Sequence, residues 1–190
     1  MRSLRPSEPL TGRIVRVEPL AERHRDGLRE AMEEAPEIFR YMLYPGFERW
    51  FEHALSAADE IPFTVLADGG VVGSTRYLNC APEHKRVEIG WTWVRRAYWG
   101  SGVNVETKLL LIEQAFERWG AMRVEFKTDA RNLRTRGSLL ALGAQFEGIF
   151  RKHMLVVDGV RDSAWYAIVD DDWPAVKEHL HARLERRARV

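Results

Sequence analysis

The feature that most constrains the fold of this chain is an alternating strand that leads through two glycines into an amphipathic helix. The run VEIGWTWV, which starts at Val87, alternates apolar residues with small or polar ones, as in a strand whose two faces meet different surroundings. This alternation predicts that Glu88 and Thr92 share a face. Beyond the glycines, apolar residues recur at spacings of four, three, four and three. They predict a helix with one buried side: Val105, Leu109, Ile112, Phe116 and Trp119.

The turn RRAYWGSG joins this strand to this helix and places Gly100 and Gly102 just before the first helical residues. A backbone without Cβ can approach a ligand closely and can adopt positive φ. The first N–H groups of a helix lack intrahelical acceptors, and the helix dipole is positive there. The segment therefore predicts a site for an anion such as phosphate, although glycine also serves in purely structural turns. A dinucleotide fingerprint would need a third glycine where Val105 stands, and no P-loop sequence occurs.

Composition restricts the class of protein. A chain of 190 residues with 45% apolar content is expected to form one domain that spans 1–190. Lys and Arg total 29 against 28 for Asp and Glu, which argues against a nucleic-acid partner. Cys80 is the single cysteine, and no Cys/His cluster has metal-ligand spacing. With neither a signal peptide nor an apolar run of membrane-spanning length, we expect a cytoplasmic protein without a metal.

Periodicity and turn residues divide the rest of the chain into strands and helices. Two Asp-Gly pairs, at Asp68 and Asp158, predict hairpin turns. The predicted strands are 12–17, 62–67, 71–78, 86–94, 122–128, 145–157 and 160–169. The predicted helices are 20–31, one or two within 35–58, 103–119, 132–142 closed by Gly143, and a C-terminal helix from about 172–187. This order predicts an α/β fold with a mixed, mostly antiparallel sheet and helices on both faces.

Several runs of residues resemble one family. VRRAYWGSGV, from Val94, and the helix after it resemble the coenzyme A pyrophosphate loop of the GNAT superfamily of N-acetyltransferases. EIGWTW, YWGSGVNVETKLLL, TDARN and LGAQFEG resemble the RimJ/RimL-like branch, the ribosomal-protein N-acetyltransferases. The resemblance runs from about Leu10 to about Trp173 and departs at Ala97, where the family carries Arg or Gln. It implies a GNAT-like sheet that splays between 86–94 and 122–128 to hold acyl-coenzyme A.

The resemblance also implies which residues bind acetyl-coenzyme A. A backbone N–H near Trp93 or Val94 would donate to the thioester oxygen, and Asn132 would bond the pantetheine arm or act simply as a helix N-cap. Glu106, beside the phosphates, would point away from them. The implied cofactor-binding residues are Trp93, Val94, Arg95, Arg96, Trp99, Gly100, Ser101, Gly102, Val103, Asn104 and Asn132.

Acetyl transfer to an amine requires the amine to be neutral, so a base is the main catalytic requirement. Glu88 is the candidate base. Alternatively, Glu88 forms only a structural salt bridge to a neighbouring strand. His84, in the preceding loop, is a weaker candidate base. Many relatives use a tyrosine as the acid where this chain has Leu139. The RimJ/RimL-like branch places Ser or Thr three residues after the asparagine, which here is Thr135. Thr135 would protonate the sulfur or hold a water, unless it is a surface hydroxyl.

These features favour an acetyl-coenzyme A-dependent N-acetyltransferase. Its acceptor would be a primary amine, either a protein N-terminal α-amino group or a small molecule, which attacks the thioester directly. The alternative is a non-catalytic acyl-coenzyme A-binding or regulatory module. Aromatic residues between 39 and 51 would line an acceptor pocket or form core. A homodimer is possible, through the hairpin at 152–168 or through the last helix.

Overall fold

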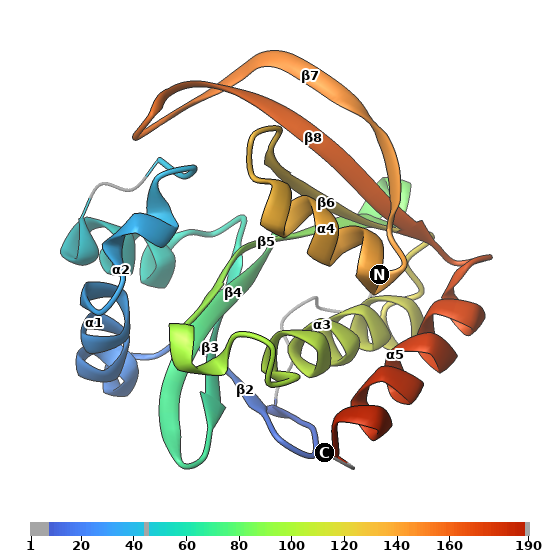
Figure 1. The fold of residues 1–190 in the computed structure, drawn as a ribbon, viewed down its shortest axis with the longest axis horizontal. Helices are drawn as coiled ribbons and strands as arrows, with labels where there is room; N and C mark the ends of the chain where they lie inside the picture. The colour runs from blue at the N-terminus through green and yellow to red at the C-terminus, as the bar shows by residue number, and fades with distance from the viewer. Residues whose placement is uncertain (1–7, 44–45, 189–190) are drawn as a thin grey trace.

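A mixed sheet of eight strands forms the centre of the molecule, in the order β1-β2-β3-β4-β5-β6-β8-β7 (Figure 1). The computed structural model describes residues 8–43 and 46–188. Neighbouring strands run antiparallel except β5 and β6, which are parallel. The strands are β1 (Leu10–Thr11), β2 (Arg16–Pro19), β3 (Ile61–Ala67), β4 (Gly70–Ala81), β5 (Arg86–Val94), β6 (Arg123–Asp129), β7 (Gln145–Val156) and β8 (Gly159–Val169). The predicted fold class and both predicted hairpins are confirmed.

Helices cover both faces of this sheet (Figure 1). They are α1 (Arg25–Glu33), α2 (Phe47–Ser56), α3 (Val103–Glu113), α4 (Leu133–Leu142) and α5 (Trp173–Ala188), with a π-helical turn at Gln114–Arg118 and short 3₁₀ turns at Glu22–His24, Pro36–Phe39, Pro82–His84 and Arg96–Tyr98. The five apolar residues predicted for one side of the helix after the loop are all buried in the main core, together with residues of α4 and α5. Among the described residues, no helix combines the length and apolar character needed to cross a membrane.

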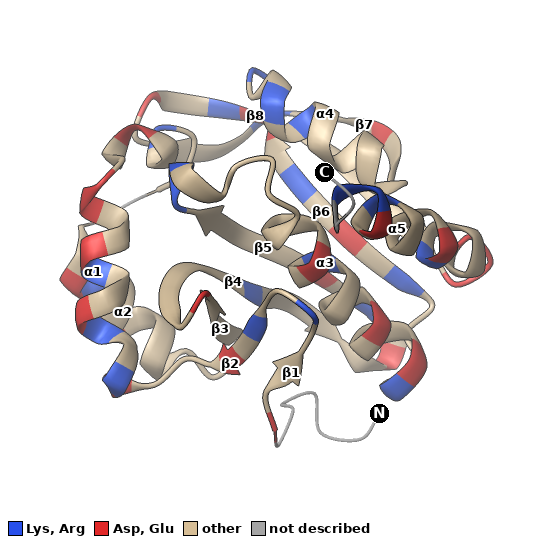
Figure 2. Ribbon diagram, turned by 60° about the horizontal axis from the view of Figure 1, so that its bottom comes forward, with Lys and Arg blue, Asp and Glu red and all other residues tan. Residues whose placement is uncertain are grey.

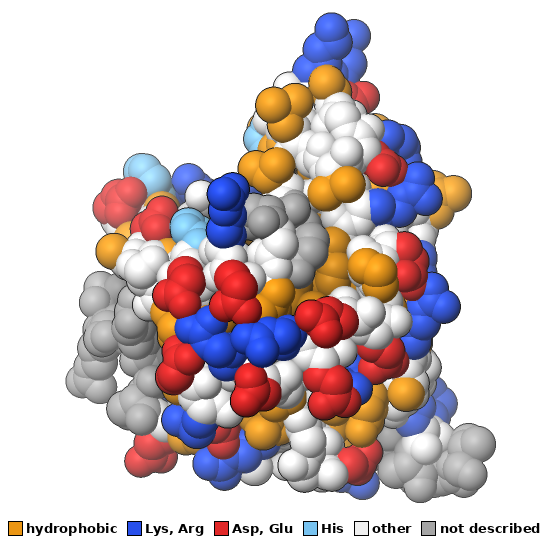
Figure 3. Space-filling model, turned by 90° about the vertical axis from the view of Figure 1, so that its left-hand side faces the viewer, with side chains coloured by type: hydrophobic (Ala, Val, Ile, Leu, Met, Phe, Trp, Pro, Cys, Tyr) orange, Lys and Arg blue, Asp and Glu red, His pale blue; other side chains and the backbone are white. Residues whose placement is uncertain are grey.

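The α1 and α2 side carries its own smaller core. Phe39, Phe47, Trp50 and Phe51 pack there against Trp93 of β5. The outer surface of this layer carries basic and acidic side chains side by side (Figure 3). Most of the aromatic residues predicted between 39 and 51 are therefore core residues, while Tyr44 lies outside the described residues.

The sheet splits between β5 and β6. The two strands pair over residues 86–88 and 123–125, and they diverge beyond Glu88. The parallel pairing follows from the crossover through α3, because only a long connection can return a strand in the same direction. The predicted opening between these strands is confirmed.

A β-bulge at Trp91 inverts the side chains in the second half of β5. Trp91 has φ 48°, and the pairing with β4 passes from Arg76↔Gly90 to Ser74↔Trp93, so one residue of β4 faces two of β5. An extra residue moves all later side chains to the opposite face. The prediction that Glu88 and Thr92 share a face is therefore wrong.

The first predicted strand, 12–17, is also wrong, because a tight turn separates β1 from β2. The Gly12 N–H donates to the Val15 carbonyl at 2.9 Å. The carboxylate of Glu106, on α3, accepts the N–H groups of Arg13, Ile14 and Val15 at 2.9, 2.8 and 2.8 Å. Glu106 thus holds this turn against α3, and it lies outside the cavity lining.

Glu106→Gln is expected to destabilise the protein, since a neutral amide replaces a buried carboxylate that accepts three N–H groups. Hydrogen bonds to charged groups contribute about 1.5–3 kcal/mol each, and we expect a loss of about 2–4 kcal/mol in the free energy of unfolding. Urea denaturation measures it. Glu113→Gln is the matched control, since Glu113 pairs with Lys177 at the surface and should lose less than about 1 kcal/mol. Equal losses in the two variants would contradict the role of Glu106.

Candidate active site

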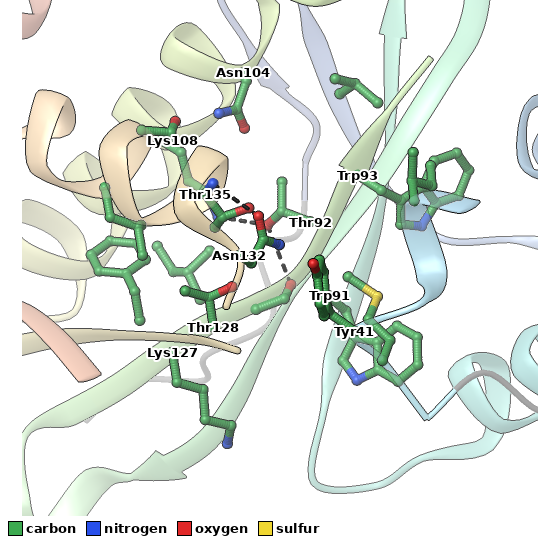
Figure 4. Close-up of a pocket in the computed structure, with 18 of the residues that line it drawn as sticks. Tyr41, Trp91, Thr92, Trp93, Asn104, Lys108, Lys127, Thr128, Asn132 and Thr135 are labelled. Atoms are coloured by element: carbon green, nitrogen blue, oxygen red, sulfur yellow. Dashed lines mark hydrogen bonds between the residues drawn. The ribbon is translucent and has the colours of Figure 1, made fainter. Parts of the chain in front are cut away.

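A cavity of about 670 Å³ occupies the opening between β5 and β6 (Figure 4). Its walls come from both strands, from the loop before α3, and from α3, α4 and α5. Nine of the thirteen predicted site residues line it: Glu88, Trp93, Val94, Trp99, Gly100, Gly102, Asn104, Asn132 and Thr135. The structure thus brings most of the predicted residues to one cavity, although they come from three separate parts of the chain.

The loop before α3 has the geometry of an anion site. Gly100 and Gly102 have φ of 79° and 104°, and Gly102 is the N-cap of α3. In the described part of the chain, the N–H groups of Gly100, Gly102 and Asn104 have no hydrogen-bond acceptor. A Cβ on Gly100 would meet open space, so a ligand has room to approach the backbone there. These donors at a helix N-terminus fit the diphosphate of coenzyme A.

Ser101 and Val103 shape the loop from within. The Ser101 hydroxyl donates to the Tyr98 carbonyl at 2.7 Å and accepts the Val103 N–H at 3.2 Å. The Trp99 indole N–H donates to the Val94 carbonyl at 3.0 Å, which ties the loop to the end of β5. Such bonds fix the backbone before a ligand arrives.

The structure places the side chains of Arg95 and Arg96 away from the cavity. Arg95 forms ion pairs with Glu30 of α1 and with Glu34 just after it, at 3.0 and 2.9 Å, and Arg96 pairs with Glu37. Their predicted role in cofactor binding therefore has no support from the positions of their side chains. The acidic partners lie about sixty residues earlier in the chain, so a local sequence pattern could not predict these ion pairs.

Other cations line the loop end of the cavity instead. The Arg134 guanidinium lies 3.5 Å from the centre of the Trp99 ring, and Arg183 and Arg187 of α5 also line the cavity. Figure 2 shows the basic C-terminal turns of α5 close to α3, and these two helices pack together. Sequence reasoning missed these residues. Arg134 lies in the first turn of α4 and Arg183 and Arg187 lie near the end of α5, and only packing brings the two helices to the loop before α3.

Glu88 forms the salt bridge that the sequence offered as the alternative, and it also lies at the cavity. Its side chain is 1% exposed and forms part of the cavity wall. Its Oε2 accepts hydrogen bonds from Asn79 at 2.7 Å and from Lys127 of β6 at 2.8 Å. The salt bridge across the opening thus holds the carboxylate in place at the cavity. His84 lies in a 3₁₀ turn with a side chain that is 69% exposed, outside the cavity lining.

The start of α4 supplies the polar groups of the opposite wall. Asn132 is the N-cap: its Oδ1 accepts the Thr135 N–H at 3.1 Å, while its amide nitrogen remains available as a donor. Thr135 and Leu139 line the cavity one and two turns along the helix. Asn132 therefore caps the helix and faces the cavity at the same time, so its two predicted roles are compatible.

The sequence reasoning overlooked Lys108 of α3. Its side chain is buried, and its Nζ donates to the Thr92 hydroxyl at 2.5 Å and lies 5.5 Å from the centre of the Phe126 ring. Burial lowers the pKa of Lys108 to about 7, against the opposing attraction of the Glu88 carboxylate. One signal was present in the sequence: Lys108 stands three residues after Val105, within the apolar side of the helix.

Lys108→Met is expected to stabilise the fold, because it removes a buried amine that has no carboxylate partner among the described residues. The expected gain is at least about 1–3 kcal/mol at pH 6. An unfolded lysine titrates near 10.4. Between the folded pKa of about 7 and that value, the unfolded chain binds more protons, so wild-type stability rises with pH and the gain shrinks. Denaturation at pH 6 and pH 9 measures this; a gain independent of pH would contradict the charged, buried state.

The side of the cavity away from the loop before α3 has aromatic and acidic residues in its wall. Tyr41, Met42 and Trp91 line it, together with Asp59 and Glu60. Tyr41 is thus the residue of the 39–51 aromatic group that faces the cavity within the described residues. Two of the carboxylates that line the cavity have basic partners: Glu60 forms an ion pair with Arg76, and Glu88 forms one with Lys127.

A sheet that splits beside a glycine-rich helix N-terminus, with free backbone donors and a deep cavity in the split, defines an acyl-coenzyme A-binding transferase. A family model of the GNAT acetyltransferase domain matches residues 15–145. The chain therefore belongs to the GNAT family of acetyltransferases. It is an acetyltransferase, and acetyl-coenzyme A is its acyl donor.

Solved structures agree with this assignment. A protein from T. thermophilus classed as an acetyltransferase is 37% identical, with a TM-score of 0.84 over 93% of this chain and 97% of that one. A GCN5-related N-acetyltransferase from Brucella melitensis is 30% identical, with a TM-score of 0.89 over 95% and 86%. RimL, a ribosomal L7/L12 alpha-N-protein acetyltransferase in complex with coenzyme A, shares the fold at 15% identity, with a TM-score of 0.77 over 86% and 99%. A search of curated proteins found no match.

Proposed function

We propose that this acetyltransferase acts on a primary amine, which attacks the thioester directly while Glu88 takes the amine proton. The observation that carries this proposal is the position of Glu88, a buried carboxylate in the wall of the cavity where the sheet opens. The salt bridge with Lys127 and the bond from Asn79 both engage Oε2. Its other oxygen is therefore the one that can accept a proton from the acceptor.

The residues proposed to bind the cofactor line the cavity, and each part of coenzyme A can be assigned to some of them. The N–H groups of Gly100, Gly102 and Asn104 would bind the diphosphate, and Asn132 would donate to the pantetheine arm. A backbone N–H at Trp93 or Val94, just after the bulge, would donate to the thioester oxygen. The thioester supplies an activated acetyl group, and Thr135 lines the side from which the sulfur would leave.

The acceptor class follows from charge and pKa. Asp59, Glu60 and Glu88 line the cavity; Glu60 is ion-paired with Arg76 and Glu88 with Lys127, whereas Asp59 has no ion pair among the described residues. The Asp59 carboxylate therefore suits an amine that arrives protonated. An α-amino group has a pKa of about 8 and a lysine about 10.4, so the α-amino group needs less help to become neutral. RimL, which shares the fold, is named for acetylating a protein α-amino group. We therefore favour a protein N-terminus, with a small-molecule amine as the alternative.

Thiol release from acetyl-coenzyme A tests the proposal directly. The protein is incubated with the donor and a panel of N-terminally free peptides, their lysine-containing, N-terminally blocked counterparts, and small primary amines. Release that depends on a free α-amino group supports the favoured acceptor. Donor binding by calorimetry with no release on any acceptor would contradict transfer to an amine.

A homodimer is a further part of the proposal. The β7–β8 hairpin arches beyond the rest of the sheet (Figure 1) and exposes apolar side chains, among them Phe150, Leu155 and Val160. Light scattering coupled to gel filtration measures the mass in solution; a 22.0 kDa species at all concentrations would contradict the dimer.

A further inference from the structure

We propose that Lys108 is the acid of the reaction and gives its proton to the coenzyme A sulfur as the carbon–sulfur bond breaks. The inference rests on the proposed function and names a second catalytic residue for it. It also explains how the chain functions with Leu139 at the position where many relatives carry a tyrosine.

The bulge in β5 separates the two sides of the reaction. Before it, Glu88 bonds to Lys127 on the side of the acidic residues. After it, Thr92 faces α3 and accepts a hydrogen bond from Lys108. Figure 4 shows Lys108, Thr92 and Thr135 converging on the same part of the cavity, while Lys127 lies apart from them. The proposed base and the hydroxyl that holds the proposed acid thus lie on opposite faces of β5, while Glu88 and Lys108 both line the cavity beside this strand.

The position of Lys108 on α3 suits the leaving thiol. Lys108 follows the N-cap Gly102 by six residues, which is about 9 Å along a helix axis. With the diphosphate at Gly102, this cavity is the space that would take the thiol arm, because its lining includes the loop as well as Lys108, Asn132 and Thr135. The amine of Lys108 is therefore within the part of the cavity where the sulfur belongs.

The surroundings of Lys108 are typical of a residue with a chemical role and not of one that only stabilises the fold. Thr92 and Thr75 form a chain of hydroxyls behind it, with 2.7 Å between their oxygens. The Phe126 ring of β6 lies 5.5 Å from Nζ, and the uncharged Thr135 of α4 lines the same cavity. The carboxylate of Glu88 on β5 is the charged group that acts on Lys108. No carboxylate in the described ranges lies within ion-pair distance. A buried amine without a counter-ion is costly, and such groups concentrate at active sites.

The proton balance closes without a further reagent. The amine nitrogen forms a bond to the acetyl carbon, the carbon–sulfur bond breaks, and its electron pair stays on sulfur. Lys108 transfers a proton from Nζ to this sulfur, which gives the free thiol and a neutral lysine. Glu88 takes the proton that the amine nitrogen loses, and solvent later returns both residues to their starting states. An acid whose pKa is about 7 is well matched to a thiolate whose conjugate acid has a pKa near 8.5.

The test measures the bound thiol itself, without an acceptor. Thiolate absorbance near 232 nm is followed against pH for coenzyme A on the protein, with desulfo-coenzyme A as the blank. Burial raises the pKa of Cys80 to about 11, so this thiol stays out of the measured range. The thiol and Lys108 titrate as a coupled pair, because a thiolate beside the amine favours the charged form of the lysine. We expect thiolate to form on the wild-type protein about one unit or more below free coenzyme A.

Lys108→Met should raise the pKa of the bound thiol by about one unit or more, and Lys108→Arg should keep it low. Lys127→Met is the matched control, because it removes the same charge from the same cavity on the Glu88 side and should leave the thiol titration within a few tenths of a unit. Coenzyme A affinity by calorimetry should be similar in all four proteins.

Two results would overturn the inference: a thiol that titrates on the wild-type protein as it does free, or an equal titration with Lys108→Met. If Lys108→Met fails to fold, the titration of the thiol on the wild-type protein is enough to test the inference. Normal coenzyme A binding with an unmoved titration removes only the role of Lys108, whereas normal titration shifts with no amine-dependent release remove the proposed transfer to amines.

Discussion

Gly102→Asp is expected to abolish measurable coenzyme A binding. Gly102, the N-cap of α3, has φ 104°. A Cβ at this position would lie 3.2 Å from Cδ1 of Ile14. A carboxylate at this position would stand against the diphosphate and compete for the same N–H groups. Two like charges 4 Å apart repel by about 4 kcal/mol at an effective dielectric constant of 20, which corresponds to about a thousandfold loss of affinity. Isothermal titration with coenzyme A measures it.

Gly137→Asp is the matched control. Gly137 lies on α4 outside the cavity lining, and a Cβ there would meet open space. The same charged side chain should leave coenzyme A affinity within about twofold of wild type, since its distance from the loop allows salt to screen the charge. Wild-type affinity in Gly102→Asp, with folding verified by circular dichroism, would remove the loop as the diphosphate site.

Glu88→Gln is expected to lower turnover by about a hundredfold to ten-thousandfold, the range that general-base catalysis contributes. Glutamine keeps the shape of the side chain, and its oxygen can still accept from Asn79 and Lys127. Coenzyme A binding should therefore persist while amine-dependent thiol release falls. Steady-state rates on the best acceptor, measured beside calorimetry, separate the two effects.

Glu125→Gln controls for loss of a buried carboxylate. Glu125 is also buried and ion-paired, with Arg86 at 3.1 Å and Arg123 at 2.7 Å, but it lies outside the cavity lining. Its replacement should lower stability and leave kcat close to wild type. If both variants lost activity equally, the effect of Glu88→Gln would be structural, and water would be the better candidate for the base.

Local features of the sequence determined most of the secondary structure. The Asp-Gly turn at Asp68 adopts positive φ at both residues, as a two-residue hairpin turn requires. Asn132 and Gly143 cap the two ends of α4, with Gly143 at φ 99°. The strand, the glycine loop and α3 follow from short-range periodicity and backbone freedom. These features depend on residues a few positions apart, so they can be recognised in the sequence alone.

Tertiary structure alone decided which side chains meet in the cavity. The bulge at Trp91 set Glu88 and Thr92 on opposite faces, and the alternating pattern could not reveal one extra residue in the pairing with β4. The β1–β2 turn depends on Glu106, more than ninety residues away. Lys108 became a buried neighbour of Thr92 only when α3 packed on β5. The sequence therefore determined the phosphate loop and the order of the elements, whereas packing between distant segments determined the environments, and hence the chemistry, of the charged residues.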